Sequence, residues 1–251
     1  MLKTDLAREL VRTNTKKIDE RIARADLYVD ATLSKKTGKP EGRYITIESD
    51  VVTKGDVSLF PRLSSALSDA IKMLAKGKSR ALAVGLGNRL LTADALGVLT
   101  IDKLVVENLC GDVTMRTLAP SVVGVTGIES YDVIRGVADV VKPDVVFAID
   151  SLCAAKVGRI GTSFQLSDAG ITPGSGVKNA RRPLNQQTLG VKVISIGVPM
   201  VVFASTITLE SGGDAELEED FVVTPKDVDI LVGHCADIIS SAINEYSANL
   251  Q

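Results

Sequence analysis

Apolar residues in this chain gather into short continuous runs, and turn residues and helical patterns separate these runs. Three of them, over 80–85, 142–149 and 191–197, are strand-sized and contain Val, Ile, Leu and Ala on consecutive positions. A strand that is buried on both faces reads as such a run, and strands of this kind alternate with helices in α/β proteins. The pattern therefore predicts an α/β fold with a mostly parallel sheet covered by helices on both faces.

The flanking segments predict further helices and strands. Loose helical periodicity indicates a helix over 6–25, and an alternating β-branched run indicates a strand over 43–49, with another strand expected over 27–33. Helices are also expected over 58–76 and at the C-terminal end. In that closing helix Thr224 is expected to act as N-cap and Pro225 to take the first helical position.

Two segments stand apart from this pattern. Residues 171–190 are rich in glycine and proline, and an irregular stretch of that length in a compact domain is usually functional or disordered. Residues 210–220 are acidic and are expected to form a solvated excursion.

Length and composition limit the class of protein. A chain of 251 residues with 45% hydrophobic content suits a single domain over 1–251. Its 29 Lys and Arg nearly balance its 31 Asp and Glu, so we expect no direct binding to nucleic acid. Neither a signal peptide nor a run of the roughly 20 apolar residues that a membrane helix needs is apparent, and we expect no membrane partner.

The cysteines indicate the compartment. The three, Cys110, Cys153 and Cys235, are an odd number at wide spacings, which argues against a disulfide framework and against a clustered zinc site. They favour a reducing cytoplasm.

Two acidic residues follow predicted parallel strands and are candidates for catalysis. In an open α/β sheet, reactive groups collect outside the carboxyl ends of the strands. Asp94 follows the strand over 80–85 after a loop that contains Gly87 and Asn88, and Asp150 follows the next strand directly. Like charges held close together cannot both ionise, so such a pair can supply an acid and a base together.

A purely structural role for the two acids is equally compatible with their positions. Asp94 can be an acid favoured by the start of a helix, and Asp150 can cap the segment after its strand. Other chemistries have less support, because the only histidine, His234, falls in the predicted closing helix. Cys153 is interpreted as a small buried hydrophobe rather than a nucleophile.

Long segments of the chain resemble the spore germination protease family, which degrades the small acid-soluble proteins of spores. The similarity is carried by GRYITIE (42–48), GLGN with TADALG (85–97), APSVVGVTGIES (119–130), KPDVVFAIDSL (142–152), QLSDAGITPGSG (165–176) and TLGVKVISIGVPMVV (188–202). The chain departs from the family pattern at Arg89, where an aromatic is common, and at Cys153, where alanine is common.

The resemblance implies several properties. They are a fold similar to hydrogenase-maturation peptidases, a homotetramer in the forespore or spore core, and two essential aspartates that fall here at Asp94 and Asp150. We expect no cofactor and no metal ion, because the chain has a single histidine. Small acid-soluble spore proteins are the implied substrates. Gly87 and Asn88 are expected to orient the substrate beside the two acids.

The resemblance also implies self-processing of a short propeptide, residues 1–5. Cleavage after an acidic residue and before a large apolar residue and alanine would fall at the bond between Asp5 and Leu6. The alternative is that Thr4 and Asp5 only cap the helix expected from Leu6 onward.

A basic loop is the last candidate site. Lys178, Arg181 and Arg182 concentrate positive charge among glycines over 174–183, and this charge would attract acidic substrate residues. A solvated loop without a binding role is the alternative.

Two other functions remain open at this stage. One is a metal-dependent maturation-type peptidase in which Asp94 and Asp150 hold a divalent ion, and the other is a catalytically silent sporulation protein of the same fold.

Overall fold

The structure is a computed structural model of the whole chain, and it describes residues 4–106, 108–109, 112–113, 115–177, 179–213 and 220–248. Among these residues one large sheet has the strand order β1-β2-β3-β9-β10-β8-β4-β7, and β11 pairs with β10. Its strands are β1 (Thr15–Lys17), β2 (Ile22–Val29), β3 (Gly42–Ser49), β4 (Ala81–Gly85), β7 (Met115–Leu118), β8 (Val145–Ala154), β9 (Ser163–Ser167), β10 (Lys192–Phe203) and β11 (Val222–Val223). A separate hairpin joins β5 (Asn108–Leu109) and β6 (Asp112–Val113).

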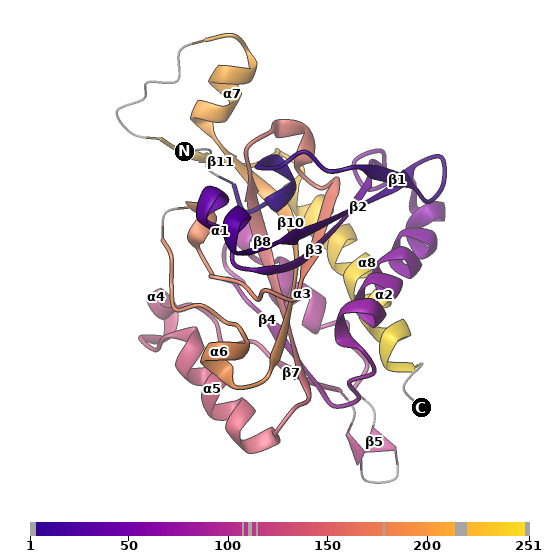
Figure 1. Cartoon of the computed structure of the whole chain (residues 1–251), viewed down its shortest axis with the longest axis vertical. Coiled ribbons are helices and arrows are strands. Elements are labelled where there is room, and N and C mark those ends of the chain that lie inside the picture. Colours follow the sequence, from indigo (N-terminus) through magenta and orange to yellow (C-terminus); the bar gives the residue numbers. More distant parts are fainter. Residues whose placement is uncertain are drawn as a thin grey trace.

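Helices cover both faces of the sheet (Figure 1). The helix α2 (Phe60–Ala75) packs beside α8 (Val228–Ala248) on one face, together with α3 (Leu96–Ile101), whereas α5 (Ser130–Val141) and α6 (Gln186–Leu189) cover the other. Shorter helices are α1 (Ala31–Thr37), α4 (Val123–Thr126), α7 (Ala204–Glu210) and the 3₁₀ turns η1 (Ala7–Glu9), η2 (Val57–Leu59), η3 (Thr92–Asp94), η4 (Val157–Arg159) and η5 (Ser175–Val177).

The central strands show why the apolar runs are continuous. In β8, Phe147 packs into the core under α2 and α8, where its ring meets Tyr246 edge-on at 5.5 Å between centroids. Its neighbours Val146 and Ala148 pack under α5 instead. Successive side chains of a strand point to opposite faces, so a strand covered on both sides needs apolar residues throughout. The predicted α/β fold with helices on both faces is confirmed.

The sheet has a parallel half and an antiparallel half. The strands β10, β8, β4 and β7 pair in parallel and correspond to the apolar runs of the sequence. On the other side of β10, the pairs from β9 through β3 and β2 to β1 are antiparallel. The parallel half carries the two candidate aspartates.

The helix expected over 6–25 is wrong. Only Ala7–Glu9 forms a 3₁₀ turn, and the rest includes β1 and β2. Ile22, Ala25 and Val29 are the buried positions of β2, and their spacing of three and four residues imitates a helix. Pairing with β3 along the whole length of β2 overrides this local pattern.

Other predicted elements agree with the structure to different degrees. The strand over 43–49 is β3 and the helix over 58–76 is α2, whereas the strand expected over 27–33 overlaps only the end of β2. The closing helix is confirmed, with His234 inside it, but it begins at Val228. The Thr224 hydroxyl donates to the Met200 carbonyl at 2.9 Å, and the expected N-cap role of Thr224 is wrong.

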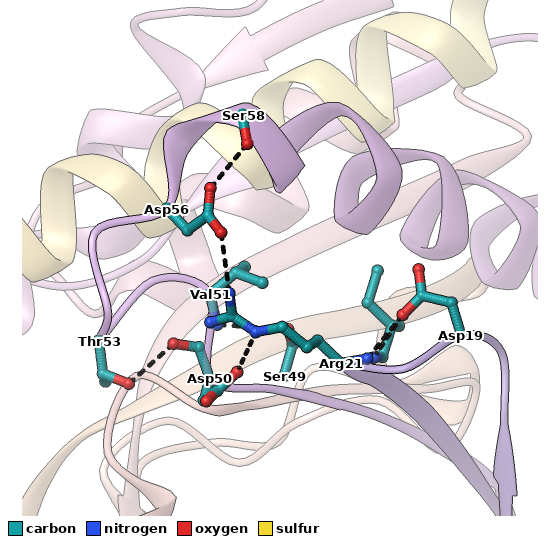
Figure 2. A network of polar contacts seen from close by, with 9 residues as sticks. Asp19, Arg21, Ser49, Asp50, Val51, Thr53, Asp56 and Ser58 are labelled. Carbon is teal, nitrogen blue, oxygen red and sulfur yellow. Dashed lines mark hydrogen bonds and ion pairs between the residues drawn. The ribbon is translucent and has the colours of Figure 1, made fainter.

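A polar network fixes the turn before β2 to the loop after β3 (Figure 2). Arg21 donates to Asp50 at 2.9 Å and to Asp56 at 2.8 Å, and Asp19 accepts from the main chain at Arg21 and Ile22. These groups lie at the surface and are partly exposed to solvent, so we expect the network to order the turn rather than to add much to stability.

Within the described residues, no helix is long and apolar enough to cross a membrane. Of the acidic segment over 210–220, residues 214–219 lie outside the described part of the chain.

Candidate active site

Asp150 lies where the sheet opens. On one side of β8 the pairing with β4 ends at Ile149, opposite Gly85. On the other side β8 continues along β10, and Asp150 pairs with Gly197. The strand therefore runs to Ala154 rather than ending at 149, and Asp150 lies inside it, with a neighbouring strand on one side only. Its side chain is 6% exposed.

Asp94 is held by the loop that follows β4. The main-chain N–H of Asn88 donates to Oδ2 of Asp94 at 2.8 Å. Gly87 adopts φ +98°, and a Cβ built at this position would fall 1.9 Å from the Asp94 carbonyl oxygen. Only glycine satisfies both the left-handed backbone and this close approach. Thr92 begins the 3₁₀ turn η3 that contains Asp94, and this turn has no side-chain cap.

Both aspartates line one cavity of about 770 Å³. Of the residues predicted from the sequence, the cavity wall includes Asp5, Gly87, Asn88, Asp94, Asp150 and Arg181. The side-chain oxygen of Asn88 accepts from the N–H of Leu90 at 3.0 Å. Asn88 thus shapes its own loop and holds Asp94 through its main chain.

Burial shifts the ionisation of both acids in the same direction. Burial is the main cause that raises the pKa of Asp94, and the hydrogen bond from Asn88 opposes this shift. The pKa of Asp150 is raised well above its ordinary value, first by burial, then by the charge of Asp94 and then by that of Asp5. The Ser151 N–H donates to Oδ1 of Asp150 at 2.9 Å and only partly offsets this rise. The arrangement favours a proton on Asp150 beside a more easily ionised Asp94.

The basic loop divides into two parts. Arg181 lines the cavity and lies 3.4 Å from Glu129, also a cavity residue. Arg182 packs against α5 instead, where it pairs with Asp132 at 3.1 Å and covers the Tyr131 ring at 3.9 Å from its centroid. Lys178 lies outside the described residues.

The N-terminal segment is docked against the end of β8. The N–H of Asp5 donates to the Cys153 carbonyl at 2.8 Å, and Leu6 and Ala7 are each 1% exposed. This differs from the helix that the sequence predicts from Leu6 onward. Neither Thr4 nor Asp5 caps η1, since the turn begins at Ala7 and its N-cap residue is Leu6, without a side-chain cap.

Several residues that hold this segment were not singled out from the sequence. Gln165 on β9 donates from Nε2 to the Asp5 carbonyl at 3.2 Å and accepts at Oε1 from the Ala7 N–H at 2.8 Å. Lys39 donates to the same Asp5 carbonyl at 2.9 Å, and burial lowers its pKa. The Ser175 hydroxyl donates to Oδ1 of Asp5 at 3.0 Å. No local pattern marks these residues, because each lies far from Asp5 in the sequence.

Cys153 and His234, the other residues considered for catalysis, each lie apart from further catalytic groups. Cys153 is 1% exposed, which agrees with its interpretation as a buried hydrophobe. His234 packs edge-on against Phe60 at 5.1 Å between ring centroids. In the part of the chain that the structure describes, no three His, Cys, Asp or Glu residues are placed to hold a metal ion.

The geometry defines an α/β protein in which a buried carboxylate, Asp150, and a half-buried one, Asp94, line one cavity where the parallel half of the sheet opens. A sequence model described as germination protease matches residues 5–212. The chain therefore belongs to the germination protease family, and it is a protease.

Individual relatives agree with this assignment. A germination protease of Caldanaerobacter subterraneus subsp. tengcongensis is 37% identical, over 86% of this chain and 81% of the relative. One of Clostridium acetobutylicum is 33% identical, over 96% of this chain and 89% of the relative. The match to the germination protease of Bacillus subtilis, 41% identical, covers 70% of this chain and only 52% of that protein.

One solved structure is similar in outline. The crystal structure of a NiFe hydrogenase maturation protease, HycI, from Thermococcus kodakarensis KOD1 matches with a TM-score of 0.47 and 24% identity. The match covers 74% of this chain and 100% of that one.

Proposed function

We propose that this protease is an endopeptidase that initiates the degradation of small acid-soluble spore proteins during germination, with water activated between Asp94 and Asp150. The observation that carries the proposal is that both carboxyl groups line one cavity and that the charge of Asp94 is a cause of the raised pKa of Asp150. Pairs of acids whose environments separate their pKa values commonly divide the roles of acid and base.

The roles follow from the two environments. Asp94, whose anion accepts the Asn88 N–H, takes a proton from water, and the water oxygen attacks the peptide carbonyl carbon. Asp150 begins protonated and gives its proton to the carbonyl oxygen. When the tetrahedral intermediate collapses, the C–N bond breaks, the leaving nitrogen receives the proton that Asp94 took from water, and one hydroxyl of the intermediate returns a proton to Asp150. No metal ion or cofactor takes part in these steps.

The cavity fits a peptide substrate. Its volume of about 770 Å³ exceeds what two carboxylates and a water need, and Arg181 places a positive charge in its wall. Acidic residues of a substrate would be attracted to this charge. The homotetramer, the location in the forespore or spore core and the absence of direct nucleic-acid binding belong to the same proposal.

Self-processing at the bond between Asp5 and Leu6 is part of the proposal. Asp5 lines the cavity, and its carbonyl oxygen accepts hydrogen bonds from both Lys39 and Gln165. Two such donors polarise the carbonyl toward attack. Residues 1–5 would leave as the propeptide.

The deciding experiment is incubation of the purified chain with a small acid-soluble spore protein, followed by mass spectrometry of the fragments. Fragments from the wild-type chain, none from Asp94→Asn and insensitivity to a chelator support the proposal. Loss of cleavage with chelator would favour the metal-dependent maturation-type peptidase instead. A folded wild-type chain that leaves the spore protein intact would favour the catalytically silent sporulation protein.

A further inference from the structure

The sulfur of Met73 lies between two arginine side chains. Nη2 of Arg24 donates to Sδ of Met73 at 3.1 Å, and Nη1 of Arg43 donates to the same sulfur at 3.4 Å. Met73 belongs to α2, whereas Arg24 and Arg43 come from the paired strands β2 and β3. The thioether therefore joins this helix to the antiparallel half of the sheet.

The sulfur is a poor match for its two donors. A thioether is a weak hydrogen-bond acceptor, whereas a guanidinium group carries a full charge and five N–H donors. Arg24 has a second partner, because Asp26 accepts from its Nε at 2.7 Å and from its Nη2 at 2.8 Å. Within the described residues, the Arg43 side chain has no hydrogen-bond acceptor other than the Met73 sulfur. A stronger acceptor at the place of the sulfur would satisfy both guanidinium groups better.

Solvent reaches Met73 more readily than the other methionines that the structure describes. Met73 is 41% exposed, whereas Met115 is 1% and Met200 is 0% exposed. Met1 lies outside the described residues. Oxidants convert methionine to its sulfoxide, and the oxidant has to reach the sulfur to do so. A small oxidant in solution, such as hydrogen peroxide, therefore meets the Met73 sulfur before those of Met115 and Met200.

Oxidation at Met73 supplies the stronger acceptor. A lone pair of the sulfur attacks one oxygen of hydrogen peroxide, and the O–O bond breaks. The second oxygen leaves as hydroxide, takes the proton of the transferred oxygen and becomes water. The sulfur loses two electrons and the peroxide gains them. The sulfoxide group is polar, and the two guanidinium groups already lie beside the atom that carries the new oxygen.

We propose that Met73 is an oxidation site for hydrogen peroxide, and that Arg24 and Arg43 bind the oxygen of the resulting sulfoxide. Oxidation then strengthens the contact between α2 and the strands β2 and β3. This is the reverse of the usual effect, because a sulfoxide commonly disrupts the packing around a methionine. None of the three residues lines the cavity of the two catalytic candidates, so the inference is independent of the proposed function.

Peroxide treatment of the full-length chain tests the site. Peptide mass spectrometry locates the added oxygen, and thermal melting is measured before and after treatment. We expect the Met73 peptide to gain one oxygen while the peptides of Met115 and Met200 stay unmodified. The oxidised chain should melt about 2–4 °C higher than the untreated chain, since stronger hydrogen bonds at the surface add modestly to stability.

Three variants identify the source of the shift. Met73→Leu keeps the size of the side chain without the sulfur, so peroxide should not raise its melting temperature, and any effect of cysteine oxidation appears there alone. In Arg43→Ala, Met73 should still be oxidised, but most of the rise should be lost. Arg43 is chosen over Arg24 because removal of Arg24 would also leave Asp26 without its partner. Arg62→Ala, at an exposed arginine of the same helix, should keep the full rise.

Each outcome decides the inference. A folded chain in which peroxide leaves Met73 unmodified, or modifies Met115 or Met200 first, overturns the oxidation site. Oxidation of Met73 that leaves the melting temperature unchanged or lowers it overturns the binding of the sulfoxide by the arginines, and so does a full rise in Arg43→Ala or in Met73→Leu. A rise that is present in the wild type and in Arg62→Ala, and lost in the other two variants, supports the whole inference.

Discussion

The main-chain N–H of Asn88 donates to the Asp94 carboxylate at 2.8 Å, across a loop that only glycine at position 87 allows to close. The hydrogen bond stabilises the ionised form of Asp94 against the burial that raises its pKa. The position of this carboxylate and its charge thus both depend on the backbone of one short turn.

Gly87→Ala should displace Asp94. A methyl group at position 87 would lie 1.9 Å from the Asp94 carbonyl oxygen at a φ of +98°, so the turn must open. We expect a loss of about 1–3 kcal/mol of unfolding free energy, measured in urea, and a large fall in hydrolysis. Gly136→Ala in α5 meets no neighbouring atom and should leave the chain as stable as before or slightly more stable. Equal effects of the two substitutions on stability and hydrolysis would contradict the claim that the turn requires glycine at position 87.

Asp94→Asn and Asp150→Asn should each abolish hydrolysis while leaving the fold intact. Each removes half of the acid–base pair, and loss of one member of such a unit costs about 10³-fold or more in rate. Activity on a spore protein and circular dichroism are measured together. Near-normal turnover in either variant removes that residue from the mechanism.

Asp150→Asn should also change how stability depends on pH. A raised pKa means that the folded chain favours the protonated acid, so stability present at low pH is lost as pH rises through the folded pKa. Asparagine does not titrate and avoids this loss. We expect the variant to melt about 2–8 °C higher than the wild type at pH 8, as one to two kcal/mol implies. The gap should shrink toward pH 4, and a gap independent of pH would argue against a buried titrating Asp150.

Reversing the charge at the two arginines should separate their roles. Arg181→Glu should raise the KM for an acidic substrate several-fold, and the effect should weaken at high salt. Arg182→Glu serves as the matched control, because Arg182 lies over Tyr131 on α5. The same KM for both variants and the wild type would make the loop a solvated one without a binding role.

Self-processing at the bond between Asp5 and Leu6 should lower the intact mass by the summed residue masses of residues 1–5. We expect the intact mass of the wild-type chain to fall accordingly under mildly acidic, dehydrating conditions, while Asp94→Asn keeps its full mass. Lys39→Met should slow the reaction, since the Asp5 carbonyl loses its charged donor. If neither the wild-type chain nor Asp94→Asn loses mass, the bond between Asp5 and Leu6 is not a self-processing site.

The sequence predicts those parts of the molecule where local pattern and tertiary environment agree. The doubly covered strands β4, β8 and β10 need apolar residues throughout, and their carboxyl ends led to Asp94 and Asp150. The sequence predicts β2 wrongly as a helix, because its buried residues have a helical spacing and only the pairing with β3 makes the segment a strand. It also misses Ser175 and Gln165, which meet Asp5 from about 170 and 160 positions away.

The docked segment from Thr4 to Ala7 acts as a peptide ligand that is covalently attached to the protein that binds it. A short connection of this kind gives the attached segment a local concentration on the order of millimolar. A peptide from another molecule has to compete with that concentration, so its apparent affinity understates its contacts with the cavity. Weakening the hold on Asp5 should therefore make the chain bind outside peptides more tightly without adding a single contact to them.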